Sequence, residues 1–187
     1  MPSQIDFSSK TPVAKDGSTI GDLCNKFFAG SPDDSNAHFL NEGVFEVLQP
    51  YIDNGKLKVL SNQTDFNSIS ILRWSSEGAQ KRMYELLEKY YSSGEKVDVI
   101  VSPFDGITYG VIYALENSGY RVGENFPLIS GQDADLRAIK NIISDKQSMT
   151  VFKDTLYLKI KFLKLTTQFL LTIINWLCLR FFAIRLS

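Results

Sequence analysis

Six side chains of this sequence combine suitable chemistry with the position expected of ligand contacts. They stand at or next to the ends of predicted strands or directly before a helix, and they are Asp34, Asn36, Trp74, Asp105, Asp133 and Lys153. Ligands of open α/β sheets bind outside the carboxyl ends of the strands, which here selects the loops at residues 30–36, 103–106, 131–133 and 152–154. We therefore expect these side chains to meet at one edge of a sheet.

Carboxylate, amide and ammonium groups around one large aromatic ring suit a monosaccharide. The polar groups exchange hydrogen bonds with sugar hydroxyls, and charged acceptors such as Asp34 and Asp133 make the shorter, stronger bonds. The C–H face of a sugar packs on an aromatic ring, and Trp74, next to Arg73, is the candidate. This inventory predicts the binding of a sugar without catalysis.

Five of these six residues also have a purely structural explanation. Asp34, Asp105 and Asp133 stand at strand-to-helix junctions, where an Asp cap contributes about 1 kcal/mol, and spacing alone favours capping over ligand binding. A single Trp such as Trp74 is more often a core or rim residue, and a single Lys such as Lys153 is more often solvated. Only their arrangement in space distinguishes the two explanations.

The sequence offers little for an enzyme, a metal or a nucleic acid. It has no nucleophile–base signature, no metal-ligand spacing and no Gly-rich phosphate loop, and its lone His38 lies near a capping turn. Cys24 and Cys178 are far apart and form no CxxC pair. The formal net charge is −1, and no dense Lys/Arg patch is present. We expect no cofactor, no metal and no nucleic-acid partner.

Helical and strand patterns alternate through the middle of the chain. Helices are predicted from Asp33 or Asp34 to Gly55, over residues 77–91, from about Ile107 to Gly119, and through the apolar positions 138–143. Short apolar strands are predicted near residues 27–28, 57–60, 97–101, 127–130 and 150–153. This alternation predicts an α/β fold in three layers, a parallel sheet with helices on both faces.

Composition divides the chain into three parts. Residues 1–25 are polar, are expected to be poorly ordered, and lack the basic and apolar regions of a secretory signal. Residues 26–155 form the predicted α/β lobe. From Thr155 to the end there are five basic residues and no acid, Gly or Pro, whereas the preceding part carries 15 Lys+Arg and 21 Asp+Glu. Residues 156–187 therefore look like an aberrant, hydrophobic and basic tail.

Several motifs in one order resemble a known family. The turn GSPDDSNA at residues 30–37 is similar to the GSPxDNNA turn of bacterial xylose-binding and multiple-sugar-binding periplasmic proteins. The same order continues with VLQPYIDNGK at 47–56, LRW at 72–74, SPFDG at 102–106, SGQDAD at 130–135 and TVFKDT at 150–155. The resemblance covers roughly 130 residues, and it identifies the chain as the C-terminal lobe of a type I periplasmic binding protein, truncated at both ends.

The resemblance implies a function and assigns roles. Such proteins close two α/β lobes on one sugar in the periplasm and deliver it to an ABC importer; some present it to a chemoreceptor or sensor kinase. Here it implies a xylose-, glucose- or galactose-like ligand bound by the six residues named above. Asp34 and Asn36 match the polar turn, Trp74 the stacking aromatic, and Asp133 the GQDA loop. The family often has Asn where this chain has Phe104, and Ser35 replaces the first Asn of the turn.

Other readings remain open at this point. The effector-binding core of a sugar-responsive transcription repressor shares the fold, although residues 1–25 contain no basic helix-turn-helix. An enzyme acting on sugars is a third reading. The tail fits an out-of-frame translation better than a membrane anchor, because Arg180 interrupts its apolar run and a span needs about 20 apolar residues. If the tail were a membrane anchor, the chain would be a membrane-attached sugar-binding lobe. If the chain has no export signal, it would be cytoplasmic or mislocalised.

Overall fold

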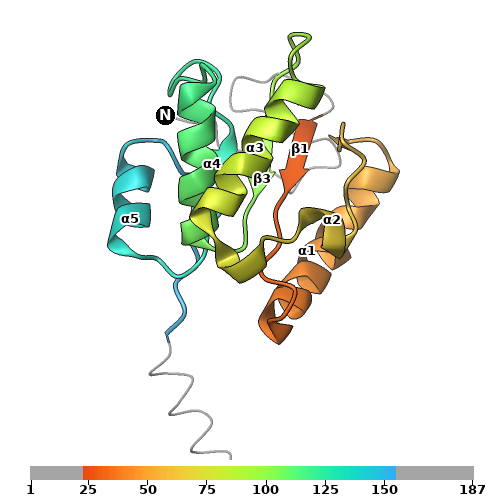
Figure 1. Cartoon of the computed structure of the whole chain (residues 1–187), viewed down its shortest axis with the longest axis vertical. Helices are drawn as coiled ribbons and strands as arrows, with labels where there is room; N and C mark the ends of the chain where they lie inside the picture. The colour runs from red at the N-terminus through yellow and green to blue at the C-terminus, as the bar shows by residue number, and fades with distance from the viewer. Residues whose placement is uncertain (1–22, 155–187) are drawn as a thin grey trace, which may run out of the picture. The chain divides into compact units, whose positions relative to one another are not determined.

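The computed structural model describes residues 23–154 (Figure 1). Its elements in chain order are β1 Leu23–Phe27, α1 Ser35–Asp53, β2 Leu57–Lys58, α2 Phe66–Ile69, a 3₁₀ turn Leu72–Trp74, α3 Ser76–Tyr90, β3 Val99–Val101, α4 Asp105–Asn117, β4 Leu128–Ile129 and α5 Leu136–Ile143. The four long helices and the four strands agree with the predicted alternation. The expected α/β fold is confirmed.

The four strands form one parallel sheet in the order β2-β1-β3-β4. Asn25 pairs with Val99 in the β1–β3 ladder, and Val99 pairs with Leu128 in the β3–β4 ladder. Because all the pairings are parallel, the carboxyl ends of these strands meet at one edge. The fifth predicted strand is reduced to a single bridge between Gln132 and Val151, which lies beyond the end of β4.

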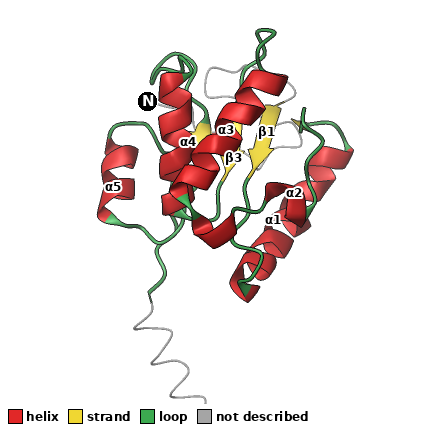
Figure 2. Cartoon of the chain, viewed as in Figure 1, coloured by secondary structure: helices red, strands yellow, loops and turns green. Residues whose placement is uncertain are grey.

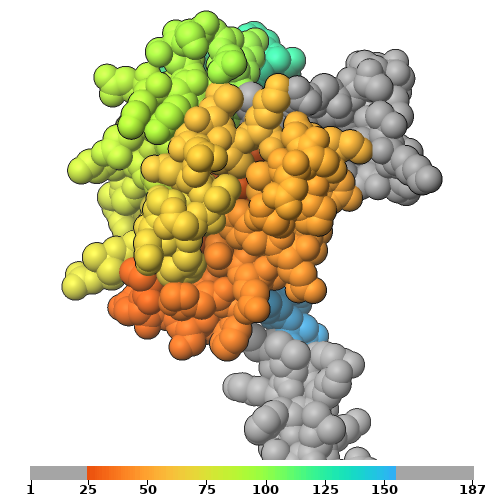
Figure 3. All heavy atoms as spheres, turned by 90° about the vertical axis from the view of Figure 1, so that its right-hand side faces the viewer, coloured from red at the N-terminus to blue at the C-terminus, as the bar shows by residue number. Residues whose placement is uncertain are grey.

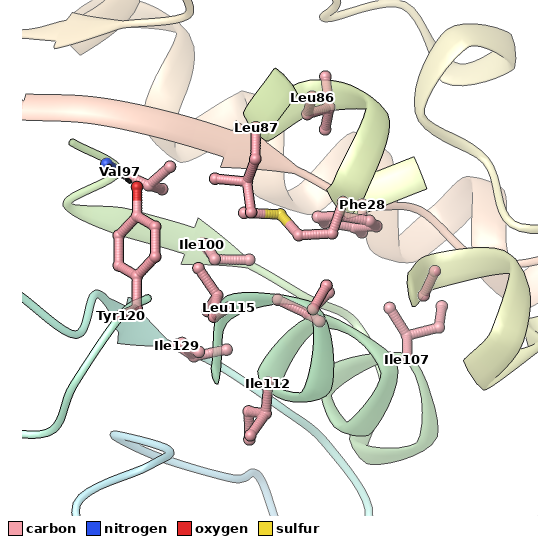
Figure 4. Close-up of a cluster of buried hydrophobic side chains, with 14 of the residues drawn as sticks. Phe28, Leu86, Leu87, Val97, Ile100, Ile107, Ile112, Leu115, Tyr120 and Ile129 are labelled. Atoms are coloured by element: carbon pink, nitrogen blue, oxygen red, sulfur yellow. Dashed lines mark hydrogen bonds between the residues drawn. The ribbon is translucent and has the colours of Figure 1, made fainter. Parts of the chain in front are cut away.

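Helices cover both faces of the sheet. Ile100 packs with α3 and α4, whereas its neighbour Val101 packs with α1 and α2, since successive side chains of a strand point to opposite faces. On the first face the buried cluster includes Ile107, Leu115 and Ile129, and the Tyr120 hydroxyl receives a hydrogen bond from Val97 N at 3.3 Å (Figure 4). The helices enclose the strands in three layers (Figure 2).

Polar side chains fix where the helices begin. Asp34, Asp65, Ser75 and Asp135 each stand before a helix and accept a hydrogen bond from a backbone N–H of its first turn. Such caps satisfy N–H groups that have no partner inside the helix. The caps therefore fix the residues at which these four helices begin.

The central strand β1 carries two polar residues into the interior. Asn25 has no exposed surface and Lys26 is 1% exposed, although strands covered on both faces are usually apolar throughout. The Lys26 ammonium lies 5.0 Å from the ring centroids of both Tyr90 and Tyr91. The Asn25 amide has no hydrogen-bond partner among the residues that the structure describes. The buried polar groups of Asn25 and Lys26 therefore make β1 contribute less to stability than an apolar central strand would.

The chain divides into two compact units, residues 1–152 and 153–187. The second unit begins at Lys153, and the predicted tail 156–187 lies outside the described residues, as does most of the predicted extension 1–25. Within residues 23–154, no helix combines the length and apolar character that crossing a bilayer requires.

Candidate functional site

The Asp34 carboxylate links the start of α1 to Trp74. Its Oδ1 accepts a hydrogen bond from Asn36 N at 2.9 Å, and its Oδ2 accepts one from the Trp74 indole Nε1 at 3.2 Å. Capping and ring orientation thus use one oxygen each, so the structural explanation for Asp34 is correct without excluding a ligand. Asn36 is exposed in the first turn of the helix, next to the same carboxylate.

Trp74 is held in a backbone conformation that few residues adopt. Arg73 and Trp74 have φ values of 56° and 54°, in the left-handed region where a side chain strains the backbone. Arg73 N donates to the Ser31 hydroxyl at 2.7 Å, which ties this segment to the turn after β1. The Ser31 hydroxyl donates in turn to Asp33 and lowers the pKa of that carboxyl.

Glycine is needed where the indole ring meets the same turn. A Cβ atom at Gly30 would lie 2.0 Å from Trp74 Cη2, so any other residue there displaces the ring or the turn. The orange segment near residue 30 and the yellow segment near residue 75 lie against one another at the surface (Figure 3). Segments about 40 residues apart in sequence are therefore brought together by interlocking contacts.

An open hollow lies at this meeting point. Its volume is about 490 Å³, and its lining consists of Ser31, Asp33, Asp34, Ser35, Arg73 and Trp74. The half-buried indole gives it an apolar wall, and the carboxylates and hydroxyls give it hydrogen-bonding groups. A ligand that has both a C–H face and hydroxyl groups matches this lining. Two of the six predicted residues, Asp34 and Trp74, thus form one surface.

Asp105 is placed differently from the prediction. It is completely buried, and its carboxylate accepts hydrogen bonds from the Gln147 amide at 3.0 Å, the Thr150 hydroxyl at 2.9 Å and Asp135 N at 3.2 Å. A side chain without exposed surface offers nothing to a sugar, so the expectation of direct contact does not agree with the structure. The carboxylate instead joins the start of α4 to the loops before and after α5, and Asp105 does not cap α4.

Asp133 stands exposed in a strained loop after β4. Its φ is 103°, that of Ala134 is 54°, and the loop is fixed by bonds from Asp133 N to Val151 O and from Ala134 N to the Thr150 hydroxyl. The cap of α5 is Asp135, which accepts from Ala138 N at 2.9 Å. The structural explanation for Asp133 as a helix cap is therefore wrong.

A pair formed by the buried Tyr109 and the exposed Asp135 steadies the same loop. The Tyr109 hydroxyl donates to the Asp135 carboxylate, and Arg137 lies 4.2 Å from the centroid of the Tyr109 ring. Burial and this bond raise the pKa of Tyr109 above its ordinary range. Partial burial raises the pKa of Asp135, but the hydrogen bonds from Tyr109 and from Ala138 N outweigh it and leave that pKa low.

Neither Lys153 nor His38 is placed at the hollow by the described residues. Lys153 begins the second compact unit, so its role as a ligand contact stays a prediction. The His38 imidazole contacts Pro32 O at 3.1 Å and stacks on Phe66, which makes it part of the scaffold behind the capping turn. Residues 23–154 contain no group of three His, Cys, Asp or Glu side chains able to hold a metal ion.

Sequence reasoning gave no role to Ser31, which lines the hollow, or to Phe104, which contacts the Trp74 ring. Ser31 is buried and bonds both Asp33 and Arg73 N, which fixes the turn. Phe104 meets the Trp74 ring edge to face, with centroids 5.8 Å apart and planes at 83°. Neither contact has a signal in spacing, because each depends on a left-handed segment that periodicity does not reveal.

The chain belongs to the periplasmic binding protein domain family, whose model matches residues 17–170. It is 46% identical over 142 residues to the multiple sugar-binding periplasmic protein SbpA of Azospirillum brasilense, covering 75% of this chain and 39% of SbpA. A solute binding protein of an ABC transporter from Clostridium phytofermentans, solved with bound β-D-glucose, is 39% identical with a TM-score of 0.68, covering 74% of this chain and 42% of that one.

The chain thus spans less than half the length of these two relatives. A separate match joins 32 residues to the 4-hydroxybutyryl-CoA dehydratase/vinylacetyl-CoA-Δ-isomerase of Clostridium aminobutyricum at 66% identity, or 17% of this chain and 6% of that enzyme. A match to so small a part of an enzyme gives no basis for assigning its chemistry here.

Proposed function

We propose that this chain is a sugar-gripping lobe that binds a monosaccharide without transforming it. The observation that carries the proposal is the pairing of a charged acceptor with an aromatic wall, Asp34 and Trp74, at the ligand edge of a parallel sheet. A sugar packs its C–H face on the indole and gives hydroxyl protons to the carboxylate and to the exposed Asn36. Asp133 contributes a further hydrogen bond in this proposal.

The relatives support the same role. SbpA is named as a multiple sugar-binding periplasmic protein, and the structure from Clostridium phytofermentans holds glucose in a solute binding protein of an ABC transporter. The proposed setting is therefore the periplasm, and the proposed partners are the membrane subunits of an ABC importer. A chemoreceptor or sensor kinase is a further partner in the same setting. The sugar enters and leaves unchanged, since transport requires no reaction.

Binding by one lobe is expected to be weak. The described site contacts a ligand from one side, whereas a closed pocket surrounds most of its ligand. If only half of the interactions of a micromolar ligand are made, the dissociation constant rises to about the millimolar range or above. Measurements must therefore reach millimolar sugar.

The test is a titration of the full chain with xylose, glucose and galactose, followed by ligand-observed NMR. We expect saturable, millimolar binding that Trp74→Ala abolishes while Phe39→Ala leaves it intact, because Phe39 is 70% exposed and lines no part of the hollow. Binding that survives Trp74→Ala would contradict the site. The same spectra record any new sugar signal, and conversion of the ligand would show an enzyme instead.

A further inference from the structure

Asp105 holds both sides of the loop that carries Asp133. Its backbone N donates a hydrogen bond to Gln132 O at 3.0 Å, and its Oδ2 accepts one from Asp135 N at 3.2 Å. The same carboxylate occupies the space beside Gly131, where an added Cβ would collide with it. Residues before and after Asp133 are therefore tied to one residue at the start of α4.

The Thr150 hydroxyl extends these contacts to the middle of the loop. It has one hydrogen to donate, and the two oxygens of the Asp105 carboxylate accept it at 2.9 and 3.0 Å. The hydroxyl oxygen in turn accepts a hydrogen bond from Ala134 N at 3.1 Å. Donation to a carboxylate polarises the hydroxyl and strengthens it as an acceptor. A chain of hydrogen bonds thus runs from Asp105 through Thr150 to the residue next to Asp133.

The loop needs such contacts because its backbone is strained. Asp133 and Ala134 have φ values of 103° and 54°, in the left-handed region that residues with a side chain disfavour. Such a conformation persists only where the surrounding contacts impose it. Asp133 itself is exposed, at the carboxyl edge of the sheet after β4. The direction in which its carboxylate leaves the loop is therefore set by contacts that end on the buried Asp105.

We infer that Thr150, anchored by Asp105, is a positioning residue that acts on sugar binding through Asp133. The inference rests on the proposed function, in which Asp133 bonds a sugar hydroxyl. The Thr150 hydroxyl is engaged by protein groups as donor and as acceptor, so it acts without contact to the sugar. If that hydroxyl is removed, Ala134 N loses its acceptor and the backbone relaxes from its left-handed conformation. The Asp133 carboxylate then turns away from the sugar.

The test replaces Thr150 with residues that keep or remove its hydroxyl. Thr150→Val preserves the shape of the side chain, and Thr150→Ser preserves the hydroxyl. Xylose and glucose are titrated against the full chain by ligand-observed NMR. We expect Thr150→Val to weaken binding about fivefold to tenfold and Thr150→Ser to weaken it less than about twofold. Thr108→Val removes another hydrogen-bonded hydroxyl, from a buried residue of α4, and is the matched control that should keep the affinity.

Two further measurements separate positioning from a loss of stability. In an Asp133→Ala chain, Thr150→Val should weaken sugar binding no further, because the side chain through which it acts is gone. The Ala134 amide should also exchange with solvent faster in Thr150→Val than in Thr150→Ser or the unmodified chain, with no sugar present. If Thr150→Val does not fold, Thr150→Ala replaces it with the same expected results.

The outcomes also separate this inference from the proposed function. If neither sugar binds the unmodified chain, the proposed function is wrong and the inference fails with it. If sugar binds and folded Thr150→Val keeps full affinity, sugar binding stands and the positioning role is wrong. Equal weakening by Thr150→Val with and without the Asp133 carboxylate, or an unchanged exchange rate at Ala134, would equally overturn the inference.

Discussion

Trp74 donates its indole hydrogen to the Asp34 carboxylate across a sequence gap of 40 residues, at 3.2 Å. The same carboxylate caps α1, so one side chain fixes the start of a helix and the angle of an aromatic ring. A displacement of the start of α1 is therefore expected to move the Trp74 ring, and a displacement of the ring is expected to move the start of α1. The ring also rests on Gly30 and meets Phe104, which leaves it little freedom.

Replacing Asp34 separates its two tasks. Asn is as good a cap as Asp, but its amide nitrogen cannot accept from Trp74 Nε1, so Asp34→Asn should keep the cap, lose about 1 kcal/mol of stability with the indole bond and weaken sugar binding about tenfold. Asp34→Ala should weaken binding and cost about 2 kcal/mol of stability, because it removes the cap as well as the indole bond. Urea denaturation and NMR titration of both variants check this. Unchanged affinity in Asp34→Asn would leave Asp34 as a cap alone.

Gly30 and Gly43 offer a matched pair of Gly→Ala changes. At Gly30 the new methyl group would collide with the Trp74 ring, so Gly30→Ala should lose about 1–3 kcal/mol of stability together with sugar binding. At Gly43, inside α1, the methyl group meets nothing within 4 Å, and Gly43→Ala should gain about 0.5–1 kcal/mol. Thermal unfolding measures both. Equal effects at the two positions would show that the ring does not rest on Gly30.

Asp133 and Asp135 are two residues apart and are expected to behave oppositely. Asp133→Asn should melt like the unmodified chain and bind sugar about tenfold more weakly, because Asp135 is the residue that caps α5. Asp135→Ala should cost about 2 kcal/mol, because the cap is lost and the Tyr109 hydroxyl loses its acceptor. Calorimetric melts and sugar titrations of the two variants give the comparison. If Asp133→Asn keeps full affinity for the sugar, Asp133 does not contact the ligand.

The interior of β1 can be improved. Asn25→Val removes a buried amide that has no hydrogen-bond partner among the described residues and places a favourable residue in a central strand, so stability should rise by about 1–3 kcal/mol. Asn117→Val, at the exposed end of α4, is the control and should not stabilise. Chemical denaturation decides the point, and a loss of stability in Asn25→Val would mean that the amide is satisfied after all.

The Tyr109–Asp135 pair predicts how stability varies with pH. The pKa of Asp135 is lowered in the folded state, so its contribution is present above about pH 4 and disappears as the pH falls through the folded value. The pKa of Tyr109 is raised, so its contribution is present below about pH 10 and disappears as the pH rises further. Tyr109→Phe should flatten both limbs of the stability curve, whereas Phe in place of the exposed Tyr113 should not. Urea melts across this pH range test it.

Apolar periodicity was sufficient for the helices and the parallel sheet, because a 19-residue helix such as α1 repeats its pattern many times. It was insufficient for α2 and for the turn at Arg73, where four residues or fewer carry no period and the backbone turns left-handed. The sequence pattern also did not reveal which of the candidate side chains are buried. Asp105 and Asp133 look alike in sequence, yet one is enclosed by Gln147 and Thr150 and the other is exposed. The difference arises because the segment after α5 folds over the start of α4 and covers Asp105.

The buried polar residues of β1 have a consequence for synthesis of the chain. Asn25 pairs with Val99, which leaves the ribosome 74 residues later, so β1 waits unpaired on one side while most of the lobe is being made. An exposed apolar strand invites association with other nascent chains. Asn25 and Lys26 interrupt the apolar run of β1 at its centre, as gatekeeper residues do. The same residues that weaken the finished sheet thereby protect the strand that must wait longest for its neighbour.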